Sequence, residues 1–123
     1  MLKSSYEVEK YICSVSNANH RKALTRLRCS AHKLAIEEGR FRNIDRNLRL
    51  CVHCNMNVIE NEYHFVMVCP KYRQLRKDHL PKYYCSFPTK QKLISLMKSD
   101  NVSLLKRLAK FVYLANELRN NID

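Results

Sequence analysis

The chain has 123 residues, of which 23 are Lys or Arg and 11 are Asp or Glu, giving a formal net charge of +12. This length predicts one domain, or one domain with an arm, and the single glycine excludes glycine-rich phosphate loops and dinucleotide-binding fingerprints. The first residues lack the apolar stretch of a signal peptide, and no apolar run approaches the roughly 20 residues of a membrane span. We therefore expect an intracellular protein with no membrane partner.

Helix-favouring side chains dominate the chain, and apolar residues recur at helical spacing. The clearest case is residues 20–38, where Leu24 and Leu27 fall on one face. Gly39 follows where a left-handed C-cap is wanted, and Thr89 is a suitable N-cap for the residues after it. The sequence predicts helices over residues 6–14, 20–38, 60–68, 71–79, 90–97 and 102–120.

The expected fold class is mainly α, a small helical domain around a zinc knuckle with a minor β-hairpin. The hairpin would pair residues 58–59 with the chain near Leu50. A basic loop, residues 40–49, precedes it, and three apolar side chains are expected to anchor this loop in the core: Phe41, Ile44 and Leu48. The expected organisation is an N-terminal helical arm, a basic helix with the zinc-binding knuckle, and a helical tail, over residues 1–19, 20–80 and 81–123.

Four residues form the most informative pattern in the chain: Cys51, Cys54, His64 and Cys69, spaced C-x2-C-x9-H-x4-C. Structural zinc is held by four Cys or His ligands in a tetrahedron, and an x2 spacing lets one tight turn present two thiolates. His64 and Cys69 are five positions apart, so a helix that holds both must end or loosen near Cys69, as Pro70 also indicates. The sequence therefore predicts Zn²⁺ as a cofactor on these four residues.

Alternatives for these residues stay open at this point. The cysteines could be buried without a ligand, as free cysteine often is, although segment 51–64 is mostly polar. His53 could compete as a ligand, and another quartet would combine His79 and Cys85 with Cys54 and Cys69. A disulfide framework is not expected, because no pairing pattern is visible in the remaining cysteines, Cys13, Cys29 and Cys85.

We do not expect an enzyme. A catalytic zinc keeps one coordination position open for water, whereas this motif offers four protein ligands. His64 is followed by Phe65 and Val66, so the His-x-Glu order of a zinc deaminase is missing. We expect no small-molecule substrate.

The positive charge is uneven along the chain. Residues 21–50 hold nine basic and three acidic side chains, segment 51–70 holds no Lys or Arg, and basic residues resume at Lys71. A positive field of this size favours a polyanion, because neutralising phosphates releases counterions. The alternative is a charged surface that only keeps the protein in solution.

Residues 26–76 resemble a known family. Within them, residues 27–40 read LRCSAHKLAIEEGR, residues 51–54 read CVHC and residues 62–72 read EYHFVMVCPKY. These motifs and their spacing resemble the C-terminal zinc-binding region of reverse transcriptases from non-LTR retrotransposons of animals. The rest of the tail, residues 77–123, carries no recognised motif.

The resemblance implies a region that holds template RNA or target DNA, and hence a nuclear location. It does not imply polymerase activity, because two-metal phosphoryl transfer needs clustered aspartates, and the four aspartates here are scattered. The chain resembles a truncated copy of the element, or a retained fragment, that lacks the polymerase domain. The alternative is a protein-interaction fragment that docks by amphipathic helices onto a partner such as a polymerase core.

We expect RNA or DNA to bind to basic helix faces, and unpaired RNA to be preferred because stacking needs unpaired bases. Phe41 and Tyr72 would stack on such bases if they are exposed. The residues expected to contact phosphates are Arg21, Lys22, Arg26, Arg28, Lys33, Arg40, Arg42, Arg46, Arg49, Lys71, Arg73, Arg76 and Lys77.

Overall fold

The computed structural model describes residues 15–120, which are mainly α-helical, as the sequence predicts. The helix expected over residues 6–14 lies outside the described residues. The α-helices are α2 (Ala18–Arg28), α3 (Ala35–Phe41), α4 (Arg73–His79), α5 (Lys82–Ser86), α6 (Lys90–Met97) and α7 (Val102–Asn120). Short turns of other helix types lie between them: η1 (Arg46–Leu48) and η3 (Pro70–Tyr72), both 3₁₀, and the π-helical turn η2 (His64–Val68).

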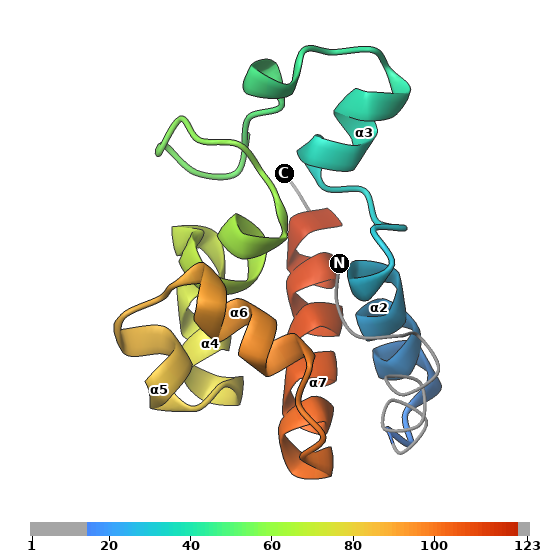
Figure 1. The fold of residues 1–123 in the computed structure, drawn as a ribbon, viewed down its shortest axis with the longest axis vertical. Helices are drawn as coiled ribbons and strands as arrows, with labels where there is room; N and C mark the ends of the chain where they lie inside the picture. The colour runs from blue at the N-terminus through green and yellow to red at the C-terminus, as the bar shows by residue number, and fades with distance from the viewer. Residues whose placement is uncertain (1–14, 121–123) are drawn as a thin grey trace.

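The long helix α7 forms the centre of the fold. It packs against α2 on one side and against α4 on the other, with α5 and α6 on the α4 side (Figure 1). Its apolar face is completely removed from solvent at Leu105, Leu108, Ala109, Phe111, Val112 and Ala115. Because isolated helices are marginal in water, burial of this face is what stabilises α7 and the helices packed on it. The predicted segments 20–80 and 81–123 thus contribute to one core.

The single helix expected over residues 20–38 is two helices, α2 and α3, joined by a bend. Ser30 takes a left-handed backbone, with φ of 57°. His32 then fixes the bend, because its Nδ1 accepts a hydrogen bond from the Leu34 amide at 3.3 Å and its Nε2 lies 2.6 Å from the Glu62 carboxylate. Apolar spacing continues across the bend, since both helices face the same core, and this is why the sequence predicted no break.

Gly39 lies inside α3 without a positive φ, so it is not the left-handed C-cap that the sequence predicted. The position is close-packed instead: a Cβ there would lie 2.4 Å from Cγ of Arg49. The Arg49 guanidinium is held in place by the carbonyl oxygens of Ile36 and Ile44, at 3.0 and 2.9 Å. The one glycine of the chain therefore makes room for an arginine side chain.

The minor β-hairpin is absent from the described residues. Leu50 and Ile59 form one isolated antiparallel bridge, and the Cys51 amide donates to the Val58 carbonyl at 2.9 Å. Pairing extends no further, because the chain between these residues is a tight turn that presents two cysteines.

The basic loop of residues 40–49 is not anchored as predicted. Its three apolar side chains are exposed, with solvent-exposed fractions of 79% for Phe41, 38% for Ile44 and 62% for Leu48. Arg49 ties this loop to the fold through the side chain described above and through its carbonyl oxygen, which accepts a hydrogen bond from the Glu60 amide at 3.0 Å.

The C-terminal helices follow the prediction more closely. Thr89 caps α6 by accepting a hydrogen bond from the Lys92 amide at 3.1 Å, and α7 has the predicted bounds. The short helix α5 lies between two helices that the sequence predicted, in a segment for which no helix was predicted. The side chains that α6 contributes to the core are Leu93, Leu96 and Met97, whereas Ile94 is 45% exposed.

Candidate metal centre and basic surface

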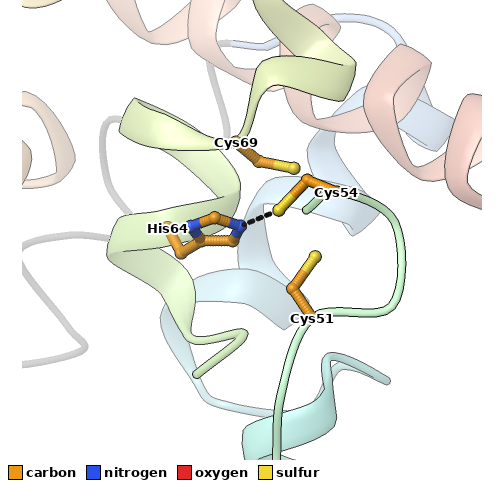
Figure 2. Close-up of side chains that lie close together, drawn as sticks. All are labelled: Cys51, Cys54, His64 and Cys69. Atoms are coloured by element: carbon orange, nitrogen blue, oxygen red, sulfur yellow. Dashed lines mark hydrogen bonds between the residues drawn. The ribbon is translucent and has the colours of Figure 1, made fainter. Parts of the chain in front are cut away.

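The four residues of the cysteine and histidine motif converge at one point. Their ligand atoms all lie within 4.8 Å of one another, and Figure 2 shows the side chains pointing toward a common centre. Cys51, His64 and Cys69 are buried and Cys54 is half-buried. A tetrahedral zinc with nitrogen and sulfur ligands has those atoms roughly 3.5–3.8 Å apart, so this cluster needs only a slight contraction to hold one.

A π-helical turn brings His64 and Cys69 together. In an α-helix, residues five apart differ by about 140° around the axis and face different directions. Here the Cys69 amide donates to the His64 carbonyl at 2.7 Å, which is the i→i+5 bond of a π turn. The predicted loosening of the helix near Cys69 is confirmed, and it lets both side chains face the same centre (Figure 2).

The other two ligands come from the turn that the Leu50–Ile59 bridge encloses. Cys51 and Cys54 lie on this turn, which closes at Asn57 with a left-handed φ of 57° that asparagine tolerates. The Cys54 Sγ lies 3.4 Å from the His64 Nε2, so Nε2 is the ring nitrogen that faces the cysteines (Figure 2).

Burial makes charged forms of these ligands unfavourable unless a cation balances them. Burial raises the pKa of Cys51 to about 12 and also raises the pKa of Cys69, while burial lowers the pKa of His64. A lowered pKa keeps the imidazole neutral, as a metal ligand must be. A divalent cation would supply the charge that stabilises the thiolates, and a set of three thiolates and one imidazole suits zinc.

Arg76 stabilises the π turn through hydrogen bonds to its backbone. Its guanidinium donates to the carbonyl oxygens of Val66, Phe65 and Cys69, at 2.7, 3.2 and 3.1 Å. These carbonyls lie where the helix loosens and ends, so a charged donor satisfies groups that would otherwise be unpaired. Arg76 was predicted to contact phosphate, but it is buried, and its role in the described structure is to support the metal-ligand turn.

A second support was not predicted from the sequence. The Glu60 carboxylate accepts two hydrogen bonds from Arg119 of α7, both at 2.8 Å, and a third from the Ala35 amide at the start of α3, at 2.7 Å. Glu60 therefore joins the knuckle to α3 and to the end of α7. No local pattern indicates this contact, because Glu60 and Arg119 are 59 residues apart in the chain.

The alternative ligands do not join the cluster. His53 is half-buried and is not among the converging residues. His79 and Cys85 are not among them either, and the Cys85 thiol lies near backbone carbonyl oxygens, including that of Arg76 at 3.6 Å.

The residues predicted to contact phosphates do not form one surface. Arg28 and Arg76 are buried, and burial lowers the pKa of both guanidinium groups, so they are not offered to a ligand in solution. Half-buried positions are Arg21, Arg49 and Lys71. Exposed positions are Lys22, Arg26, Lys33, Arg40, Arg42, Arg46, Arg73 and Lys77. The last two lie on α4, across α7 from α2 (Figure 1).

Two hollows are lined by four of the exposed cations of the N-terminal part, Lys22, Arg26, Lys33 and Arg42. The α2–α7 hollow, of about 620 Å³, is lined by Lys22, Arg26 and Lys33 among others. The α3 hollow, of about 500 Å³, is lined by Lys33, Arg42 and Arg49 among others. Because Lys33 lines both, a continuous run of cations leads from α2 past the bend to α3, and we call Lys22, Arg26, Lys33 and Arg42 the basic track.

The two aromatic residues predicted to stack on bases differ in position. Tyr72 is buried beside Phe65, with ring centroids 5.0 Å apart, so it belongs to the core. Phe41 is 79% exposed at the end of α3.

Comparison with known proteins adds no family to these observations, because no family model, no curated protein and no solved structure matches the chain. Within residues 15–120, no helix combines the length and the apolar character needed to cross a membrane. The ligand cluster and the basic track are therefore the observations from which function is inferred.

Proposed function

We propose that this chain is a nucleic-acid-binding module whose fold is closed by a structural zinc ion, and that it has no catalytic activity of its own. The observation that carries the proposal is the basic track beside a buried cluster of four metal ligands. Single-stranded or structured RNA is the preferred ligand, with DNA as the related alternative.

The charge balance along the track supports a polyanionic ligand. The carboxylates that line the two hollows and remain near the track are Glu38 and Glu117, and Glu38 lies 3.8 Å from Arg42 in an exposed ion pair. Exposed pairs of this kind are weak, so phosphate can compete for Arg42. Glu60 also lines the α3 hollow, but it is occupied by Arg119. The lining of each hollow therefore has more cationic side chains than carboxylates available to pair with them.

Zinc has a structural role in this proposal. Four protein ligands leave no coordination position for water or substrate, which is the pattern of structural sites. The segment that holds the ligands, residues 51–70, contains no Lys or Arg, so it is poorly suited to contact phosphate. Zinc would instead fix the knuckle, through Glu60, against α3 and α7.

The resemblance to the C-terminal zinc-binding region of non-LTR retrotransposon reverse transcriptases fits this proposal. That resemblance rests on the motifs of residues 26–76, and it would make the chain a relative of the nucleic-acid-holding region of those enzymes. We propose a nuclear location on the same grounds.

Charge reversal on the basic track tests the proposal. Arg26→Glu with Lys33→Glu should weaken binding to a labelled single-stranded RNA more than tenfold without loss of helicity. Losing two phosphate contacts should also reduce the slope of log affinity against log salt by about 1.4. The matched control, Lys98→Glu with Lys106→Glu, makes the same change in net charge at exposed positions away from both hollows. Equal weakening by the two variants would show that the track is not the contact surface.

A protein-docking function is the second candidate, and the exposed apolar side chains around the α3 hollow favour it. Val52 on the knuckle turn is 84% exposed and Leu48 is 62% exposed. The amphipathic helices α2 and α7 already bury their apolar faces against each other. Docking would therefore use this smaller patch, and partner binding would change little with salt.

A further inference from the structure

We propose that the α2–α7 hollow receives the base of one unpaired nucleotide, an inference that rests on the proposed nucleic-acid function and adds a specific site to it. The hollow has a volume of about 620 Å³, within the range of small-ligand pockets. Its walls come from α2, from the bend after α2 and from the last two turns of α7, three segments held together by the central core (Figure 1).

The hollow has cations at one side and an apolar floor. Lys22, Arg26 and Lys33 stand against a single carboxylate, Glu117, while the fourth cation of the lining, Arg119, is paired with Glu60. The apolar surface that the hollow offers comes from Ala31, which is exposed, and from Ala23 and Tyr113, which are half-buried. A phosphate alone would use the cations and leave this apolar floor in water, whereas a nucleotide places a base on the floor and its phosphate among the cations.

The opposite wall carries groups suited to the polar edge of a base. Asn116 and Asn120 are four residues apart on α7, so they lie on the same helix face, and both line the hollow. Each amide offers donors and an acceptor, as the Watson–Crick edge of a base does. In a duplex that edge is already paired and the base is stacked, so only an unpaired nucleotide can enter.

Filling the hollow tests the inference. Ala31 is exposed, lines the hollow and has no left-handed backbone, so Ala31→Phe can occupy the space without strain in the main chain. The variant should bind a labelled single-stranded RNA about tenfold more weakly, the loss expected when one base contact is removed. Its affinity for the same RNA annealed into a duplex should stay within about twofold, because phosphate contacts on the basic track remain. Ser95→Phe on α6, exposed and outside the hollow, is the control and should leave both affinities unchanged.

A second variant, Asn116→Ala with Asn120→Ala, removes the amides without adding bulk and should show the same selective loss. Unchanged single-strand affinity in both variants, or equal loss for single strand and duplex, would overturn the base-binding site. Failure of the proposed function is a different result, because the unmodified protein would then bind neither RNA in a salt-dependent way.

Discussion

At the scale of single residues, the metal ligands and the glycine are closely constrained by their surroundings. Cys51 and Cys69 are buried thiols whose raised pKa values reflect an environment unsuited to uncompensated thiolates. A bound cation supplies that compensation, and the binding energy of a structural zinc is folding energy. Removing a ligand should therefore affect folding.

Cys54→Ser should lose zinc and unfold the knuckle, because structural zinc contributes about 10 kcal/mol or more, comparable with the whole stability of a small domain. Metal content by mass spectrometry and helicity by circular dichroism measure the two effects, and chelator treatment of the unmodified protein should reproduce them. Cys29→Ser, at an exposed cysteine outside the cluster, should keep its zinc. Full helicity of the Cys54 variant in chelator would contradict a structural role for the metal.

Gly39→Ala should destabilise the protein by about 1–3 kcal/mol, because the added methyl group meets the Arg49 side chain at 2.4 Å. Arg49 cannot move away freely, since its guanidinium is bound to two carbonyl oxygens. Urea denaturation of Gly39→Ala, Arg49→Ala and the double variant measures the effect. In the Arg49→Ala background the Gly39 substitution should cost far less; an undiminished cost would show that crowding by Arg49 is not the reason for glycine.

At the scale of elements, the Glu60 carboxylate connects three parts of the fold, namely the knuckle, α3 and α7. Glu60 follows the knuckle turn. Its carboxylate accepts hydrogen bonds from the first amide of α3 and from the Arg119 guanidinium in the last turn of α7. The α3 helix has no side-chain cap of its own, so Glu60 takes that place. Both ends of the Glu60–Arg119 pair are largely buried, with side-chain exposures of 2% and 16%.

Glu60→Ala should lower the free energy of unfolding by about 3–5 kcal/mol, because it leaves the Arg119 guanidinium buried without its partner. Double-mutant analysis with Arg119→Ala, by urea denaturation of the zinc-loaded protein, isolates the pair. Glu38→Ala removes a more exposed pair and should cost under about 1 kcal/mol. Additive effects of the Glu60 and Arg119 substitutions would show that the pair does not couple knuckle and helix.

At the scale of the whole molecule, local patterns predicted what local interactions determine. The spacing of the Cys and His residues predicted the metal-ligand cluster. Apolar periodicity predicted α6 and α7, and Thr89 marked the start of α6. The bend at Ser30, the burial of Arg28 and Arg76, and the Glu60–Arg119 pair depend on tertiary packing between distant segments, which periodicity does not report. The prediction of a hairpin was wrong for a related reason. The residues that would have extended the pairing beyond the Leu50–Ile59 bridge form the turn that carries Cys51 and Cys54.

The central claim is that this metal-closed fold presents cations to nucleic acid, and a salt series tests it most directly. Binding of the zinc-loaded protein to a labelled single-stranded RNA should weaken steeply as salt rises. If the four cations of the basic track each neutralise one phosphate, log affinity should fall against log salt with a slope of about −3. A slope near zero, or no binding even at low salt, would contradict the claim and favour a protein-docking fragment.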